Sequence, residues 1–137
     1  MSAWLPIGKH RYAIEEDLFI FEAHGEIDAA EARHLMELMS ELDAARGRVL
    51  ALFDVSLGAS MPQESRRLIA RWNRKGKPPA PTAVVGANAL LHGMAVLLTQ
   101  AIALLTRRPV PLRFFKNRPE ARAWLLSCKS PEAHAAH

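Results

Sequence analysis

The sequence lacks two features of secreted proteins. Its one cysteine, Cys128, has no partner in the chain, so no intramolecular disulfide can form. Residues 1–11 contain neither the long apolar run nor the small-residue cleavage site of a secretory signal peptide. We therefore expect a cytoplasmic protein that is held together by its hydrophobic core and not by covalent cross-links.

Motifs of several catalytic and metal-binding classes are also missing. There is no Gly-x-Ser-x-Gly elbow for a serine nucleophile and no glycine pattern of a phosphate-binding or dinucleotide-binding loop. None of the six histidines shows a metal-ligand spacing with the cysteine or with a second carboxylate. The sequence therefore predicts a non-enzymatic protein with no metal site and no cofactor.

The chain does contain enough apolar material for one core. It has 137 residues, of which 50% are hydrophobic and 23% are charged, a balance that is typical of globular domains. Two domains in this length would each have too thin a core. We expect a single domain over residues 1–137, with a disordered tail at residues 130–137.

Hydrophobic periodicity predicts alternating strands and helices. Asp28 and Glu31 have the spacing of a capping box at the start of the first helix. We expect these elements in order: strands Ile7–Ile14 and Leu18–His24, a helix from Asp28 to Gly47, strand Val49–Phe53, a helix from Pro62 to Gly76, strand Thr82–Val85, a helix from Asn88 to Thr106, strand Leu112–Phe115 and a helix from Asn117. The order ββαβαβαβα indicates an α/β fold with a single mixed, mostly parallel sheet flanked by four helices.

Four short motifs lie within or next to these predicted elements. They are Gly25-Glu26-Ile27-Asp28, LFDVS at Leu52–Ser56, AVVG at Ala83–Gly86, and RFFKNRPEARAWL at Arg113–Leu125. On these residues the chain, over about residues 7–127, resembles STAS domains and in particular the SpoIIAA-like branch, which is linked to Sec14-type lipid-binding folds. The resemblance implies a STAS-like α/β fold that works by binding partners.

The loop after the strand Val49–Phe53 is the first candidate site. Ligands of open α/β sheets bind beyond the carboxyl ends of the strands, where Asp54 is expected. The resemblance to anti-sigma factor antagonists implies a phosphorylated serine nearby, and Ser56, Ser60 and Ser65 are the candidates. Asp54-Val55-Ser56 matches the first half of the family's loop motif, whereas the phosphoacceptor half is absent. The same residues also suit local hydrogen bonds to the loop backbone.

The predicted helix from Asn88 to Thr106 is the second candidate site, because residues 78–106 contain no charged side chain. A membrane span is not favoured, since His92, Thr99 and Gln100 interrupt the apolar run. A helix that is apolar on nearly every side needs cover that one small domain does not supply. We expect a second subunit, a protein partner or an apolar ligand on its outer face, which the sequence assigns to Leu90, Met94, Leu97, Leu98 and Leu105.

Charge is unevenly divided along the chain. Residues 1–60 carry 5 basic and 11 acidic side chains, whereas residues 61–137 carry 13 basic and 3 acidic ones. Arg67, Arg71 and Arg74 recur at helical spacing and predict a basic face. Such a face suits an anionic lipid headgroup or a nucleic acid, and a solvated helix surface explains it equally well. Nucleic-acid binding is not favoured, because no aromatic side chains accompany the charges.

The sequence thus favours a non-enzymatic STAS-like interaction domain. We expect regulatory protein–protein binding, as a homodimer or with another protein, through the apolar helix or the Asp54 loop. Two alternatives stay open: binding of a lipid or other small apolar ligand against residues 89–106, and a phosphorylation-switched adaptor that resembles the anti-sigma factor antagonists.

Overall fold

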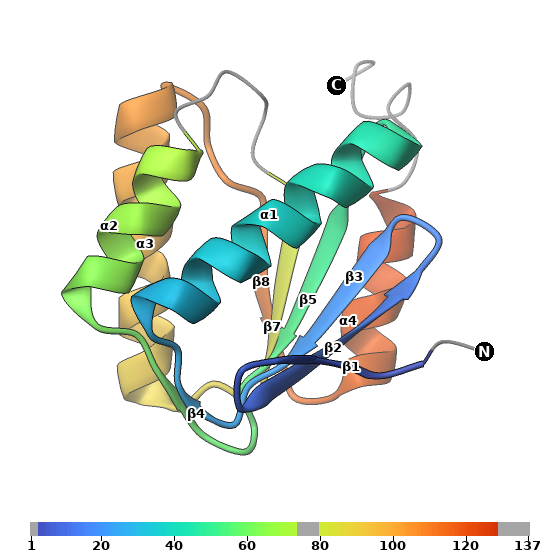
Figure 1. Ribbon diagram of the computed structural model, residues 1–137, viewed down its shortest axis with the longest axis horizontal. Coiled ribbons are helices and arrows are strands. Elements are labelled where there is room, and N and C mark those ends of the chain that lie inside the picture. Colours follow the sequence, from blue (N-terminus) through green and yellow to red (C-terminus); the bar gives the residue numbers. More distant parts are fainter. Residues whose placement is uncertain (1–2, 74–79, 129–137) are drawn as a thin grey trace.

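One six-stranded mixed sheet organises the computed structural model (Figure 1). The structure describes residues 3–73 and 80–128. The strand order is β1-β2-β3-β5-β7-β8. Neighbouring strands are antiparallel among β1 (Leu5–Ile7), β2 (His10–Glu15) and β3 (Leu18–Glu22). They are parallel from β3 through β5 (Leu50–Asp54) and β7 (Thr82–Val85) to β8 (Leu112–Phe115).

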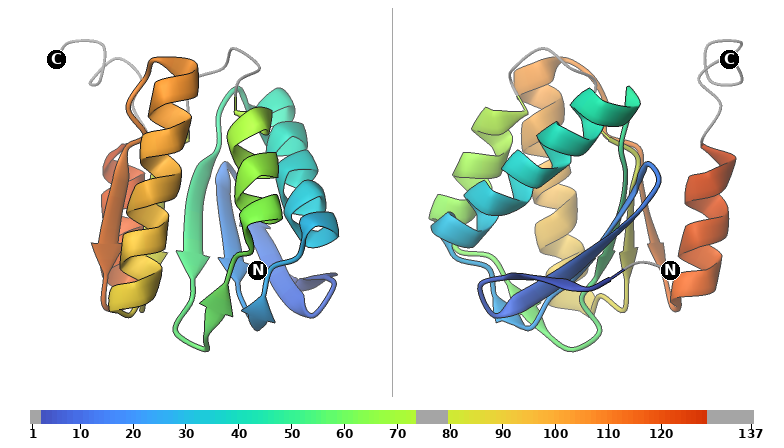
Figure 2. Two further views of the ribbon diagram at one scale, coloured as in Figure 1. Left: turned by 90° about the vertical axis from the view of Figure 1, so that its left-hand side faces the viewer. Right: turned by 45° about the vertical axis from the view of Figure 1, so that its right-hand side comes forward.

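Helices cover both faces of this sheet (Figure 2). On one face lie α1 (Ala29–Arg46), α2 (Gln63–Trp72) and α3 (Ala89–Thr106), and on the other lies α4 (Arg118–Ser127). Because side chains alternate along a strand, Phe19 and Phe21 of β3 pack on the three-helix side, whereas Leu18 and Ile20 pack toward α4. The inner strand β5 is buried on both faces, as its continuous apolar run predicted.

The ends of the helices follow the predicted capping residues. The Asp28 carboxylate accepts a hydrogen bond from the Glu31 N–H at 2.8 Å, and the Glu31 carboxylate accepts one from the Asp28 N–H at 3.0 Å, which confirms the capping box. Gly47 ends α1 with a φ of 83°. Asn88 and Asn117 cap α3 and α4 through their side-chain oxygens.

The predicted fold class is confirmed, but the predicted first strand is wrong. Residues 7–14 do not form one strand, because a turn at Gly8 separates β1 from β2. Gly8 has a φ of 56°, and a Cβ atom there would lie 2.1 Å from a Glu31 carboxylate oxygen. Glycine is therefore needed both for the turn and for the close approach of α1. The element order of the main sheet begins βββα instead of ββα.

Other predicted boundaries differ less. Two short strands that the sequence did not indicate, β4 (Gly25–Glu26) and β6 (Ala59–Ser60), form a small parallel sheet of their own. Helix α2 ends at Trp72, before the predicted stop at Gly76, which lies outside the described residues. The predicted disordered tail, 130–137, also lies outside them.

Candidate functional site

An apolar cavity of about 180 Å³ lies between α3 and the other elements on the three-helix side of the sheet. Phe21, Phe53 and Val84 contribute part of the sheet wall, and Leu35 and Ile69 contribute from α1 and α2. The α3 residues that line it recur at helical spacing: Leu91, Met94, Ala95, Leu98, Thr99 and Ile102. A cavity of about 150 Å³ with walls of this kind is large enough for a benzene molecule.

Methionine is unusually frequent in the walls of the cavity. The chain has 5 methionines, and those that line the cavity are Met36, Met39, Met61 and Met94. The methionine side chain is flexible and polarisable, so that it adapts to apolar groups of different shapes. The walls can therefore adapt to apolar ligands of different shapes.

The opposite face of α3 is exposed to solvent. Leu90, Leu97 and Leu104 are 71%, 66% and 81% exposed, and their spacing of seven residues places them in one stripe. Ile102 is the buried residue of this helix. We call Leu90, Leu97 and Leu104 the outer stripe. Three leucines that recur along the exposed side of one helix make this stripe a candidate interaction surface.

The predicted outer face of α3 is therefore only partly correct. Leu90, Leu97 and Leu105 are exposed, whereas Met94 and Leu98 line the cavity. The prediction that all five side chains share one outer face is wrong for these two, because the five spread over about 100° of the helix circumference at about 100° per residue. That arc reaches from the solvent side to the cavity side.

Among the described residues, α3 is the one helix that is long and apolar enough to cross a membrane, judged by length and composition. Only 6% of it is buried inside the domain. Helix α3 connects β7 to β8, and these two strands are parallel neighbours in the same sheet. A helix between two such strands runs back across one face of their sheet.

The predicted Asp54 site lies at the carboxyl end of β5, and its carboxylate is fully engaged. Oδ1 accepts hydrogen bonds from the Ser56 N–H at 3.0 Å and from the Ser56 hydroxyl at 2.6 Å. Oδ2 accepts one from Nε of Arg118 at 2.6 Å. Burial raises the pKa of Asp54, but the Ser56 hydrogen bonds and the Arg118 charge outweigh burial and hold that pKa below its ordinary value.

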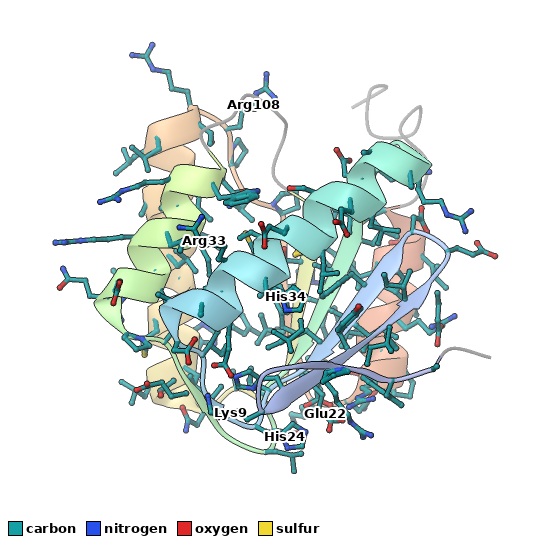
Figure 3. All side chains as sticks on the ribbon, in the orientation of Figure 1. Lys9, Glu22, His24, Arg33, His34 and Arg108 are labelled. Atoms are coloured by element: carbon teal, nitrogen blue, oxygen red, sulfur yellow. The ribbon has the colours of Figure 1, made fainter. Side chains whose placement is uncertain are left out.

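Glu22 joins Asp54 in one ion-pair cluster at this edge of the sheet, where Figure 3 shows Glu22 and His24 together. Its carboxylate accepts hydrogen bonds from Nε and a terminal nitrogen of Arg11 at 2.8 and 3.1 Å, pairs with His24 at 2.7 Å, and also binds Arg118. The Arg11 hydrogen bonds are the main cause that lowers the pKa of Glu22 to about 2. Each carboxylate thus already has its partners.

Sequence reasoning found Asp54 but missed the rest of this cluster. Arg11 and Glu22 pair across the adjacent strands β2 and β3, whereas Arg118 comes from α4, and only the fold brings it to them. A usable signal was present, because Glu22 and Asp54 each end a buried apolar strand and are paired in the parallel register of β3 and β5. Two carboxylates at one sheet edge predict a nearby cation.

The candidate serines occupy three different environments. Ser56 is exposed, and its hydroxyl is bonded to Asp54. Ser60 is exposed in β6 and also lines the cavity. Ser65 is fully buried, and its hydroxyl donates to the Ile27 carbonyl at 2.8 Å. The prediction of Ser65 as a contact or switch residue is therefore wrong, because its side chain holds α2 against the segment that precedes α1.

The predicted basic face is present in part. Arg67 and Arg71 are exposed on α2, which packs against α3. Arg74 lies outside the described residues. In residues 3–73 and 80–128, no group of three or more His, Cys, Asp or Glu side chains is placed so that it could hold a metal ion.

Comparisons with known proteins agree with this architecture. The model of the SpoIIAA-like family matches residues 18–126. A solved structure, an uncharacterised protein of the DUF3478 family with a SpoIIAA-like fold from Shewanella loihica PV-4, is 17% identical, with a TM-score of 0.55 over 91% of this chain and 92% of that one. No curated protein matches the chain. Because the family model covers most of the sheet and its helices, the chain belongs to the SpoIIAA-like family.

Proposed function

We propose that this chain is a non-enzymatic binding domain that takes up a lipid-like or other small apolar ligand between α3 and the sheet. The observation that carries this proposal is the cavity of about 180 Å³ with apolar walls from the sheet and three helices. Protein interiors are normally packed as densely as organic crystals, so the apolar walls around this space offer dispersion contacts to a molecule that enters it. Such a ligand also removes its own apolar surface from water.

The weak attachment of α3 supports the proposal, because it gives a ligand a way in. The helix packs against α2, and Ile102 is its buried residue. An element with few buried apolar contacts separates from the domain at a lower free-energy cost than the core does. We propose that α3 moves aside to admit the ligand and does not cross a membrane, since a span would place the adjacent strands β7 and β8 on opposite sides of a bilayer.

The ion-pair cluster at the sheet edge supports the non-enzymatic part of the proposal. Glu22, Asp54 and Arg118 satisfy one another, and their ion pairs hold both carboxylates in the ionised form. A general acid or base at neutral pH needs a pKa close to 7. The pKa values of Glu22 and Asp54 are instead lowered, further away from 7. We assign this cluster the role of joining β3, β5 and α4.

Native mass spectrometry of the protein isolated from its own host tests the proposed function. We expect a native mass that corresponds to the chain with a small apolar molecule bound. Denaturing mass spectrometry should give the mass of the chain alone, and organic extraction should release the molecule. A protein that is isolated without any ligand, and that also fails to bind added 1-octanol, contradicts the proposal.

A second candidate function, regulatory contact with a protein partner or a second copy, is favoured by the outer stripe. Leu90, Leu97 and Leu104 are exposed, and water-exposed apolar area is the usual material of homodimer interfaces. Sedimentation of the wild type and of the Leu97→Gln variant tests it. A dimer that the substitution dissociates supports this function, and a monomer in both samples contradicts self-association.

A further inference from the structure

The polar residues that line the cavity are Ser60, Arg66, Asn73, Thr82 and Thr99. Three of them use their side-chain donors within the nearby backbone. The Asn73 amide donates to the Ile69 carbonyl at 2.8 Å, and the Thr82 and Thr99 hydroxyls each donate to a carbonyl at 2.9 Å. These three side chains therefore offer few free donors to a ligand.

Arg66 is different, because its positive charge has no counter-ion within residues 3–73 and 80–128. One guanidinium nitrogen donates to the Met61 carbonyl at 3.0 Å. A guanidinium carries five N–H donors, so most of them stay available. Within the described part of the chain Arg66 forms no ion pair. The side chain is half-buried and borders a cavity whose walls are mostly apolar.

A cation at the edge of an apolar space is stabilised by an anion brought there by a ligand. Ser60 is an exposed residue that borders the same cavity and precedes α2 in the chain. The N-cap residue of α2, Pro62, provides no side-chain hydrogen bond, and the positive end of the helix dipole also favours a negative group near the first turn. Arg66 and Ser60 therefore supply a polar anchor for one end of a molecule whose remainder is apolar.

We infer that the ligand is an amphiphile with a single carboxylate, held by the Arg66 guanidinium, and with an apolar chain that lies against the α3 and methionine walls. This inference rests on the proposed function and adds the chemistry of the headgroup. One guanidinium balances one negative charge and matches a carboxylate in its planar, two-pronged geometry. A phosphate monoester carries about −1.5 to −2 charges near neutral pH, which would leave part of its charge unbalanced in an apolar setting.

The volume of the cavity limits the apolar part of the ligand. A cavity of about 150 Å³ accepts a six-carbon ring, and the space here is about 180 Å³. An alkyl chain of roughly six to eight carbons therefore suits the cavity. Octanoate and 1-octanol are a matched pair of probes, since they share the chain length and differ in the charge of the headgroup.

Titrations of the full chain with these two probes test the inference, with the methyl signals of the cavity methionines as the readout. For octanoate we expect the dissociation constant to rise about tenfold in Arg66→Gln and by a smaller factor in Arg66→Lys, which keeps the charge but loses the two-pronged geometry. For 1-octanol it should not change in either variant. Arg67→Gln is the matched control, because Arg67 is the exposed neighbour on the same helix and does not line the cavity.

The outcomes separate the headgroup inference from the proposed function. If Arg66→Gln leaves octanoate binding unchanged while both probes shift the methionine signals, the carboxylate inference is overturned and the proposed function stands. An equal loss for both probes would give Arg66 a structural role and would also overturn the inference. If neither probe shifts these signals in the wild type, the proposed function fails, and the inference fails with it.

Discussion

Leu97 and Leu98 are consecutive residues of α3 with different surroundings: Leu98 lines the cavity, and Leu97 is 66% exposed. Tryptophan at position 98 adds bulk to the cavity side of α3, and tryptophan at position 97 adds the same bulk to the exposed side. Leu98→Trp should fill cavity volume and weaken 1-octanol binding about tenfold or more, because the ligand loses its space. Leu97→Trp should bind as the wild type does. Equal binding by both variants, measured by titration calorimetry, would place the ligand elsewhere.

The two sides of α3 should also differ in their contribution to stability. Ile102 is 5% exposed, so Ile102→Ala should lower the free energy of unfolding by about 2 kcal/mol or more. Leu104 is 81% exposed, and Leu104→Gln should change that free energy by less than about 0.5 kcal/mol. Urea unfolding followed by circular dichroism measures both. A large loss in Leu104→Gln would mean that the outer stripe is buried in solution, as it would be in a dimer.

Gly86 illustrates a steric requirement at the edge of the sheet. It has a φ of 78°, and a Cβ atom there would lie 2.5 Å from Cβ of Ser56. Gly86→Ala should therefore destabilise the domain by about 3 kcal/mol, through both the backbone conformation and the clash. Gly47 has a similar φ of 83° but nothing within 4 Å, so Gly47→Ala should cost about 1 kcal/mol. Equal losses in urea unfolding would contradict the clash.

The ion-pair cluster should make stability depend on pH in the acid range. The pKa of Glu22 is lowered from 4.5 to about 2 in the folded chain. A carboxyl group of this kind contributes its full stabilisation above the unfolded pKa and loses it as the pH falls through the folded pKa. The wild type should therefore lose stability between about pH 4.5 and pH 2, and Glu22→Gln should show a shallower loss over that range.

Glu37, which is exposed on α1, provides the control for this pH dependence. Glu37→Gln should retain the wild-type slope of unfolding free energy against pH. Glu31, whose pKa is also lowered to about 2, should leave a residual slope in Glu22→Gln. A slope in Glu22→Gln equal to that of the wild type would contradict the role given to Glu22.

The elements of the fold were predictable where the signal is local. The capping residues Asp28, Asn88 and Asn117 act within a few residues of their own positions, and their helices begin where the sequence indicated. The turn at Gly8 was missed because its requirement is not local. It depends on the Glu31 carboxylate of α1, which approaches Gly8 only in the folded chain.

The candidate site was less predictable, because periodicity does not separate two apolar sides of one helix. The sequence identified α3 as a helix that is too apolar for one small domain to cover, but it assigned Met94 and Leu98 to the same side as Leu97. The importance of Arg66 was not visible either. In the sequence it is one of several arginines in a basic segment, and only the fold distinguishes it by placing it at an apolar cavity.

Intermolecular nuclear Overhauser effects between 1-octanol and the methyl groups of the chain test the central claim most directly, because they locate the bound molecule. We expect contacts between the alkyl protons of 1-octanol and the methyl groups of the cavity methionines, which are Met36, Met39, Met61 and Met94. Contacts only with the exposed methyl groups of Leu90, Leu97 and Leu104 would contradict the account, because they would place the apolar molecule on the outer stripe and leave the cavity empty.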